Sequence, residues 1–184
     1  FYNLHTNISF NSIIHNSKES YKKSDYGGKK IIEWPFYNFL NIYIYDSEKI
    51  AEKLWIEWLI SEYLKYCLVP KIKGGMFKGT IHKQACEIIN HNKEYLINNP
   101  QKIDTNTILE SCKIFVANKF KLVESIKANG FLYSKSNKIY ANFKNNEYEL
   151  FSGHHRSAIL KLLKYKKIDQ IWAYSMIYKL LKKI

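Results

Sequence analysis

Arginine is almost absent from this chain: of its 29 basic residues, only Arg156 is not a lysine. Asn, Ile and Tyr are abundant beside the lysines, a bias that indicates an AT-rich coding sequence with lysine as the default cation. A guanidinium group offers a rigid planar fork of donors that an ammonium group cannot copy. We therefore expect Arg156 to lie where that fork is needed; the alternative is retention by chance.

Cysteine and long hydrophobic runs are also scarce. The three cysteines, Cys67, Cys86 and Cys112, are widely spaced and form no CxxC pair. This pattern is typical of reduced, mostly buried thiols, and it predicts a cytoplasmic protein rather than a disulfide framework. No stretch reaches the roughly 18 apolar residues that a membrane span needs. The sequence therefore predicts no membrane partner.

Acidic residues are few, with 16 against 29 basic residues and a formal net charge of +13. A basic surface favours anionic partners such as nucleic acid, nucleotides or acidic lipid. The alternative is that the lysines, which form no dense block, are spread over solvated faces. The apolar content of 46% is enough to bury a core, which excludes a disordered chain.

The first half of the chain alternates between polar stretches and helical patterns. Residues 1–30 are polar and are expected to form a loop or a weakly ordered segment that wraps the domain. The aromatic and β-branched run 36–45 predicts a strand. Asp46 and Ser47 precede apolar residues at helical spacing, which predicts a capped helix over 48–67. Further helices are predicted over 80–98, 104–118 and 119–129, the last ending at Gly130.

The predicted secondary structure changes near residue 118, where strand patterns become frequent. The elements expected there are strands over 138–143, 147–152 and 170–177, a turn at Lys144-Asn145-Asn146, and a helix over 154–166. We therefore predict an α+β fold in two regions. A mainly helical region (1–118), packed on the core or serving as a lid, precedes a core formed by residues 119–184.

The junction between the second of these strands and the helix that follows is the best candidate site. A helix that begins directly after Ser152-Gly153 presents unpaired N–H groups and a positive dipole end to an anion. Glycine lets the backbone approach a ligand closely. His154, His155 and Arg156 then project from the first turn, which points to recognition of phosphate or carboxylate.

Other interpretations of this junction stay open. The histidines can be polar surface residues, with Arg156 paired to a carboxylate at the core edge. A zinc site is disfavoured, because adjacent helical residues project about 100° apart. Glu149, on the strand that leads into the junction, is a candidate general base or metal ligand. The alternative for Glu149 is the solvent-facing side of an edge-like strand.

The pattern around this junction resembles a known family. The phrase Glu124-Ser125-Ile126-Lys127-Ala128-Asn129-Gly130-Phe131, two strands, Phe151-Ser152-Gly153-His154-His155-Arg156-Ser157-Ala158, a leucine-rich helix and Tyr165-Lys166-Lys167-Ile168 resemble the ParB N-terminal/sulfiredoxin superfamily. The resemblance covers about residues 119–178. It implies a small mixed sheet with helices, in which a glycine-to-arginine box opens a helix and binds nucleotide phosphates.

The resemblance implies specific roles for the residues of the box. The cofactor would be ATP, ADP or CTP, with Mg²⁺ expected and its ligands unknown. The residues implied in cofactor binding are Ser152, Gly153, His154, His155, Arg156 and Ser157. Catalysis would rest on His154, His155, Arg156 and Glu149. The activity implied is that of a kinase-like phosphotransferase with a small-molecule acceptor, or of a nucleotide hydrolase.

Departures from the family pattern disfavour two of its activities. Sulfiredoxins carry a nucleophilic cysteine directly after the box glycine, where this chain has His154. Partition proteins need further DNA-binding and dimerisation domains after the box, and only 28 residues follow Arg156 here. The alternative function is a DNA-associated ParB-like binding or nuclease module. A third hypothesis is a scaffold whose helical region binds a protein partner.

Overall fold

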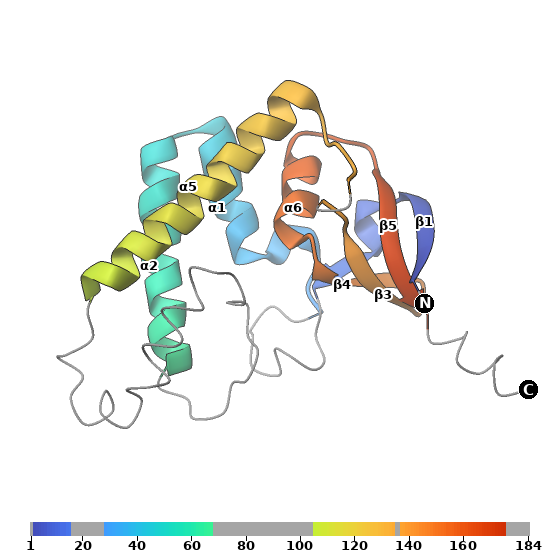
Figure 1. Cartoon of the computed structure of the whole chain (residues 1–184), viewed down its shortest axis with the longest axis horizontal. Coiled ribbons are helices and arrows are strands. Elements are labelled where there is room, and N and C mark those ends of the chain that lie inside the picture. The colour runs from blue at the N-terminus through green and yellow to red at the C-terminus, as the bar shows by residue number, and fades with distance from the viewer. Residues whose placement is uncertain (1, 16–27, 68–104, 135–136, 176–184) are drawn as a thin grey trace, which may run out of the picture.

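The computed structural model describes residues 2–15, 28–67, 105–134 and 137–175 as an α+β fold (Figure 1). The strands are β1 (Tyr2–Ile8), β2 (Ile13–His15), β3 (Tyr140–Lys144), β4 (Glu147–Ser152) and β5 (Ile168–Ser175). The α-helices are α1 (Pro35–Tyr45), α2 (Glu48–Cys67), α5 (Thr105–Asn129) and α6 (His154–Leu162), and two 3-10 turns are η1 (Phe10–Ser12) and η2 (Ile31–Glu33).

The described strands form one five-stranded mixed sheet in the order β1-β5-β3-β4-β2. β1 runs antiparallel to β5, and β4 runs antiparallel to β3. The β3–β5 and β2–β4 pairs are parallel. The β3–β4 hairpin turns at Asn145 and Asn146, whose φ angles of 52° and 60° suit the tight turn of a right-twisted hairpin. The turn predicted at Lys144-Asn145-Asn146 is therefore confirmed.

The prediction of a loop over residues 1–30 is wrong where the structure describes this region. β1 and β2 lie within it and pair with β5 and β4. Most of β1 is exposed, and the apolar residues Tyr2, Leu4 and Ile8 alternate with polar ones, a signal that the polar composition of the segment concealed. β2 contributes only Ile13 and His15 to the core, which is too short a pattern to predict a strand.

The strand predicted over 36–45 is also wrong, because this segment forms α1. Pro35 occupies the first turn, where its fixed φ favours helix initiation. Phe36 and Leu40 are spaced four residues apart and are both buried, so they share one helical face. The aromatic and β-branched composition favoured a strand, but packing of this face against the other helices decided the outcome.

The remaining predicted elements differ from the observed ones mainly in the residues where they begin and end. α2 has the predicted bounds, and α5 is one helix where two were expected, so it crosses residue 118 without a break. Gly130, with φ +71°, follows the last residue of α5 as predicted. β3, β4 and β5 confirm the predicted strands within the described residues, and α6 ends at Leu162 rather than residue 166. The helix predicted over 80–98 lies outside the described residues.

The core lies between the sheet and the helices, with α6 placed between the sheet and the group formed by α1, α2 and α5 (Figure 1). Trp34, Phe36 and Trp55 are among its largest fully buried side chains. Cys112 is a buried free thiol, and burial raises its pKa to about 11. No helix in the described part of the chain is long and apolar enough to span a membrane.

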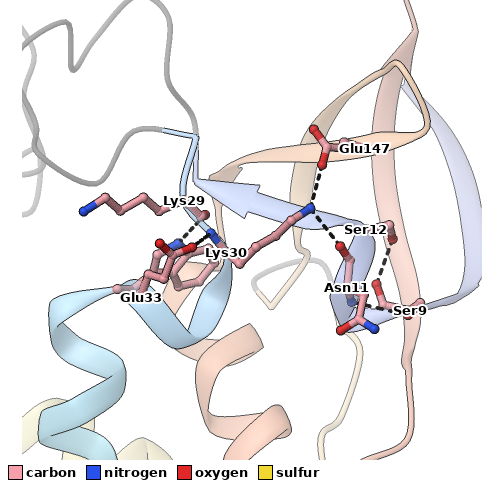
Figure 2. A network of polar contacts seen from close by, with 8 residues as sticks. Ser9, Asn11, Ser12, Lys29, Lys30, Glu33 and Glu147 are labelled. Carbon is pink, nitrogen blue, oxygen red and sulfur yellow. Dashed lines mark hydrogen bonds and ion pairs between the residues drawn. The ribbon is translucent and has the colours of Figure 1, made fainter.

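A polar network joins the N-terminal segment to the hairpin (Figure 2). The Lys30 ammonium group donates to Glu147 Oε1 at 2.6 Å and to the Asn11 carbonyl at 2.9 Å. The Lys30 amide donates to Glu33 Oε2 at 2.9 Å, which fixes the start of η2. The Lys30–Glu147 pair is half exposed, so we expect it to contribute at most about 1 kcal/mol. Its main effect is to orient the chain entering α1.

The helical conformation of α1 can be tested at Asn38, an exposed position in its middle. Alanine is a better helix former than asparagine, so Asn38→Ala should raise the free energy of unfolding by about 0.5 kcal/mol. Asn38→Val should change it little, because valine and asparagine have similar helix propensities. Urea unfolding measures both. A gain with valine and a loss with alanine would indicate the strand instead.

Candidate functional site

The chain passes from β4 to α6 through Gly153, at the strand-to-helix junction predicted from the sequence. Gly153 has φ +89° and ψ 13°, a left-handed conformation that residues with a side chain rarely adopt. A Cβ at this position would lie 2.8 Å from Cγ1 of Ile139. Only glycine therefore fits, and the helix begins with a first turn whose N-cap residue has no side chain to bond the backbone N–H groups.

The three side chains of the first turn of α6 point in different directions. The His154 ring faces β2 and lies 4.2 Å from the His15 ring between centroids. The His155 ring packs on Phe36 at 4.4 Å, within the helical core. Arg156 donates from Nη1 to the Lys138 carbonyl at 3.3 Å. The sequence predicted one cluster of three cations, whereas the structure distributes these side chains among three environments.

Both histidines of this turn are neutral near pH 7. Burial, and then the charge of His15, lower the pKa of His154 to about 3, although a hydrogen bond to the Leu150 backbone acts in the opposite direction. Burial and the nearby charge of Lys119 hold the pKa of His155 well below its usual range. Aromatic rings also surround His155, with Trp55 and Phe115 within about 6 Å. Of the three side chains, only Arg156 is a cation at neutral pH.

The protonation of the two ring nitrogens of His154 follows from their hydrogen bonds. Its Nε2 atom is buried and makes no hydrogen bond to any residue that the structure describes. The nitrogen that donates to the Leu150 carbonyl is therefore Nδ1. In the neutral imidazole the proton then stays on Nδ1, and Nε2 carries a lone pair. This geometry gives His154 an acceptor atom beside the start of α6.

A second cation, Lys119 of α5, accompanies Arg156. Burial and the charge of Arg156 lower the pKa of Lys119, and burial lowers the pKa of Arg156. The Lys119 ammonium group lies 4.6 Å from the centroid of the Phe115 ring. Two neighbouring cations, partly removed from water, repel each other. An anion bound between them would relieve this repulsion.

Sequence reasoning missed Lys119 and His15. Lys119 follows Cys112 and Val116 at helical spacing on the buried side of α5, so a lysine in an apolar stripe was the available signal. His15 is 1% exposed and follows Ile13 on the buried face of β2. A strand of three residues gives too little pattern to reveal that alternation.

The other predicted site residues are divided between two faces of the sheet. Ser157 is buried, and its hydroxyl donates to the Gly153 carbonyl at 3.1 Å, which stabilises the first turn. Ser152 is half buried at the end of β4, directly before Gly153. Glu149 pairs in register with Ile14 and Asn142. Because Leu150 faces the core, alternation places Glu149 on the opposite face of the sheet, away from His154.

The described residues provide few side-chain ligands for a metal ion. They contain no group of three or more histidine, cysteine, aspartate or glutamate side chains arranged to hold one. Mg²⁺ prefers oxygen ligands and retains several waters when it binds with phosphates. A Mg²⁺ ion that entered with a nucleotide would not require such a group.

Comparisons with known proteins add no relative to this description. The chain matches no protein-family model, no curated protein and no solved structure. The resemblance to the ParB/sulfiredoxin superfamily therefore stays a prediction.

Substitution of Gly153 tests the steric requirement at the junction. Gly153→Ala should lower the free energy of unfolding by more than about 2 kcal/mol, because it adds a contact with Ile139 to the left-handed strain. Gly130→Ala is the matched control. Its φ is +71°, but its Cβ would meet only the Tyr165 hydroxyl at 3.8 Å, so about 1 kcal/mol is expected. Equal losses in urea unfolding would contradict the proposed contact.

The buried histidines predict acid sensitivity. The unfolded chain binds a proton at His154 near pH 6.5, whereas the folded protein does so only near pH 3. The unfolded state therefore binds more protons between these values, and the free energy of unfolding should fall as pH falls below 6.5. His154→Asn should make the dependence of Tm on pH less steep between pH 6.5 and 4. An identical slope in His154→Asn and in the unsubstituted protein would refute the role of His154.

Proposed function

We propose that the start of α6 binds the phosphate groups of a nucleotide, ATP, ADP or CTP. On this proposal the chain is a phosphotransferase or nucleotide hydrolase of the ParB/sulfiredoxin-like superfamily. The observation that supports it best is the left-handed Gly153 junction beside two neighbouring cations, Arg156 and Lys119. An uncapped helix start and fixed cations are the features that phosphate sites combine.

The backbone would supply the first contacts with the phosphate. The N–H groups of a first helical turn point toward the N-terminal end and carry a partial positive charge. The left-handed Gly153 directs the chain abruptly from β4 into that turn, and no side chain caps it. Ser157, which bonds the Gly153 carbonyl, would hold the turn in place rather than contact the ligand.

Arg156 and Lys119 would neutralise the charge of the phosphate oxygens. The Lys138 carbonyl orients one end of the Arg156 guanidinium group. A planar guanidinium held in this way can give two parallel hydrogen bonds to one phosphate, and it can stabilise charge that grows in the transition state. Lys119 would add a second positive charge from α5. The sequence did not predict this contribution.

His154 would hold the junction in place rather than transfer a proton. Its Nδ1–H group donates to the Leu150 carbonyl, and its Nε2 atom is buried beside the His15 and Trp34 rings, where the hydroxyl group of an acceptor molecule does not reach it. His155 would act as an anchor in the aromatic core. Glu149 is left out of this mechanism because it lies on the opposite face of the sheet.

The Mg²⁺ ion expected with a nucleotide would be held mainly by the phosphate oxygens and water. When bound, it would neutralise phosphate charge during transfer. The residues of this chain would bind and orient the phosphate. The acceptor is a small molecule that carries a nucleophilic hydroxyl group, or water in the case of hydrolysis.

A nucleotide panel tests this function. ATP, ADP, CTP and GTP, each with Mg²⁺, should be compared for their effect on Tm, and at least one should raise it. Arg156→Lys should weaken binding of that nucleotide about tenfold or more, because the planar fork is lost while the charge is kept. Lys119→Met should also weaken it, whereas Lys121→Met, an exposed lysine on the same helix, is the control. An unchanged affinity in Arg156→Lys would refute the proposed role.

A further inference from the structure

The two faces of the sheet have different compositions. The face that packs on α6 carries small and aliphatic side chains that are fully buried, among them Ala141, Leu150 and Ala173. The residues that alternate with them point to the other face. All the described α-helices lie on one side of the sheet in Figure 1, so they leave this second face uncovered within the described residues. We call it the aromatic face, and it comprises Tyr2, Tyr140, Phe151, Trp172 and Tyr174.

The rings of the aromatic face form one surface across β1, β5, β3 and β4. The Tyr2 ring lies 5.3 Å from Tyr140, 6.0 Å from Phe151 and 6.0 Å from Tyr174, between centroids. Tyr140 and Phe151 are stacked at 6.0 Å. Tyr2 is 46% exposed and Phe151 38% exposed, which is high for aromatic side chains. A contiguous exposed patch of this kind indicates a binding surface.

Positive charge accompanies these rings. The Lys138 ammonium group lies 4.0 Å from the centroid of the Trp172 ring. Lys144, at the end of β3, is exposed. Of the two carboxylates of β4, Glu147 is paired with Lys30, and Glu149 lies beside Asn142. The chain as a whole has a formal net charge of +13. The surroundings of the aromatic face therefore favour a polyanion as its partner.

We propose that the aromatic face binds single-stranded nucleic acid. Bases would stack on Tyr2, Tyr140 and Phe151, and lysines would neutralise the phosphates. Every base has a π-face, so stacking on aromatic rings is tolerant of sequence, and basic grooves follow the backbone. A second copy of this chain fits less well, because two proteins that each carry +13 repel each other. The surface lies on the face of the sheet opposite α6, so it is separate from the phosphate site at Gly153.

Fluorescence anisotropy with labelled oligonucleotides tests this surface directly. The full chain should bind single-stranded oligo(dT) or oligo(U) more tightly than a duplex of equal length, and more weakly as salt rises from about 50 to 200 mM. The double variant Tyr2→Leu/Phe151→Leu keeps apolar bulk but removes two rings. It should weaken binding about tenfold or more. Lys138→Gln should lower the slope of affinity against salt by about one counterion.

Control variants separate base stacking from non-specific attraction to lysines. Tyr165→Ala removes an exposed aromatic residue outside the aromatic face and should leave affinity unchanged. Urea unfolding of each variant verifies that it is folded. Comparison of the DNA and RNA oligonucleotides shows which nucleic acid is preferred. The nucleotide-induced shift in Tm should persist in Tyr2→Leu/Phe151→Leu, so that failure at one site can be told from failure at the other.

Three results would overturn the proposal. One is no binding to either single strand at about 50 mM salt. Another is equal affinity for duplex and single strands that the double leucine variant does not change, which would assign binding to dispersed lysines. A third is a dimer in solution that dissociates when these rings are removed, which would assign the face to a second copy of the chain.

Discussion

The close approach of Gly153 to Ile139 is the steric constraint on which the site depends. Ile139 precedes β3 and is fully buried, so the end of β4 must pass over it without a side chain. The left-handed glycine then reverses the chain into α6. That reversal places His154 against β2, His155 against α1 and Arg156 beside α5. Because Gly153 has no Cβ atom, the chain can turn here and place three side chains in separate parts of the core.

The parts of the fold that the sequence predicted well have strong local signals. The Gly153 junction, the Asn145-Asn146 turn and the Gly130 helix end all rest on backbone conformations that few residues adopt. The α2 helix buries Ala51, Trp55 and Leu59 at four-residue spacing, and the strands of the hairpin have bulky alternating residues. In each case the local preference and the final packing agree, so the prediction needed no knowledge of distant contacts.

The parts that the sequence did not predict depend on partners far away in the chain. β1 and β2 are strands because β5 and β4 offer them hydrogen bonds, and α1 is a helix because Phe36 and Leu40 pack on other helices. The charge state of the site is another such property. The sequence predicted His154 and His155 as cations, but burial keeps them neutral. Lys119 enters the site only because α5 crosses behind Arg156.

The order of strands in the sheet affects how the chain folds. β1 and β2 occupy the two outer edges of the sheet, although fewer than five residues separate them in the chain, from Ile8 to Ile13. β1 cannot pair until β5 exists, more than 150 residues later in synthesis (from Ile8 to Ile168). Contacts of such high sequence separation slow folding. The first strand therefore emerges from the ribosome long before its partner, and closure of that edge is a late event.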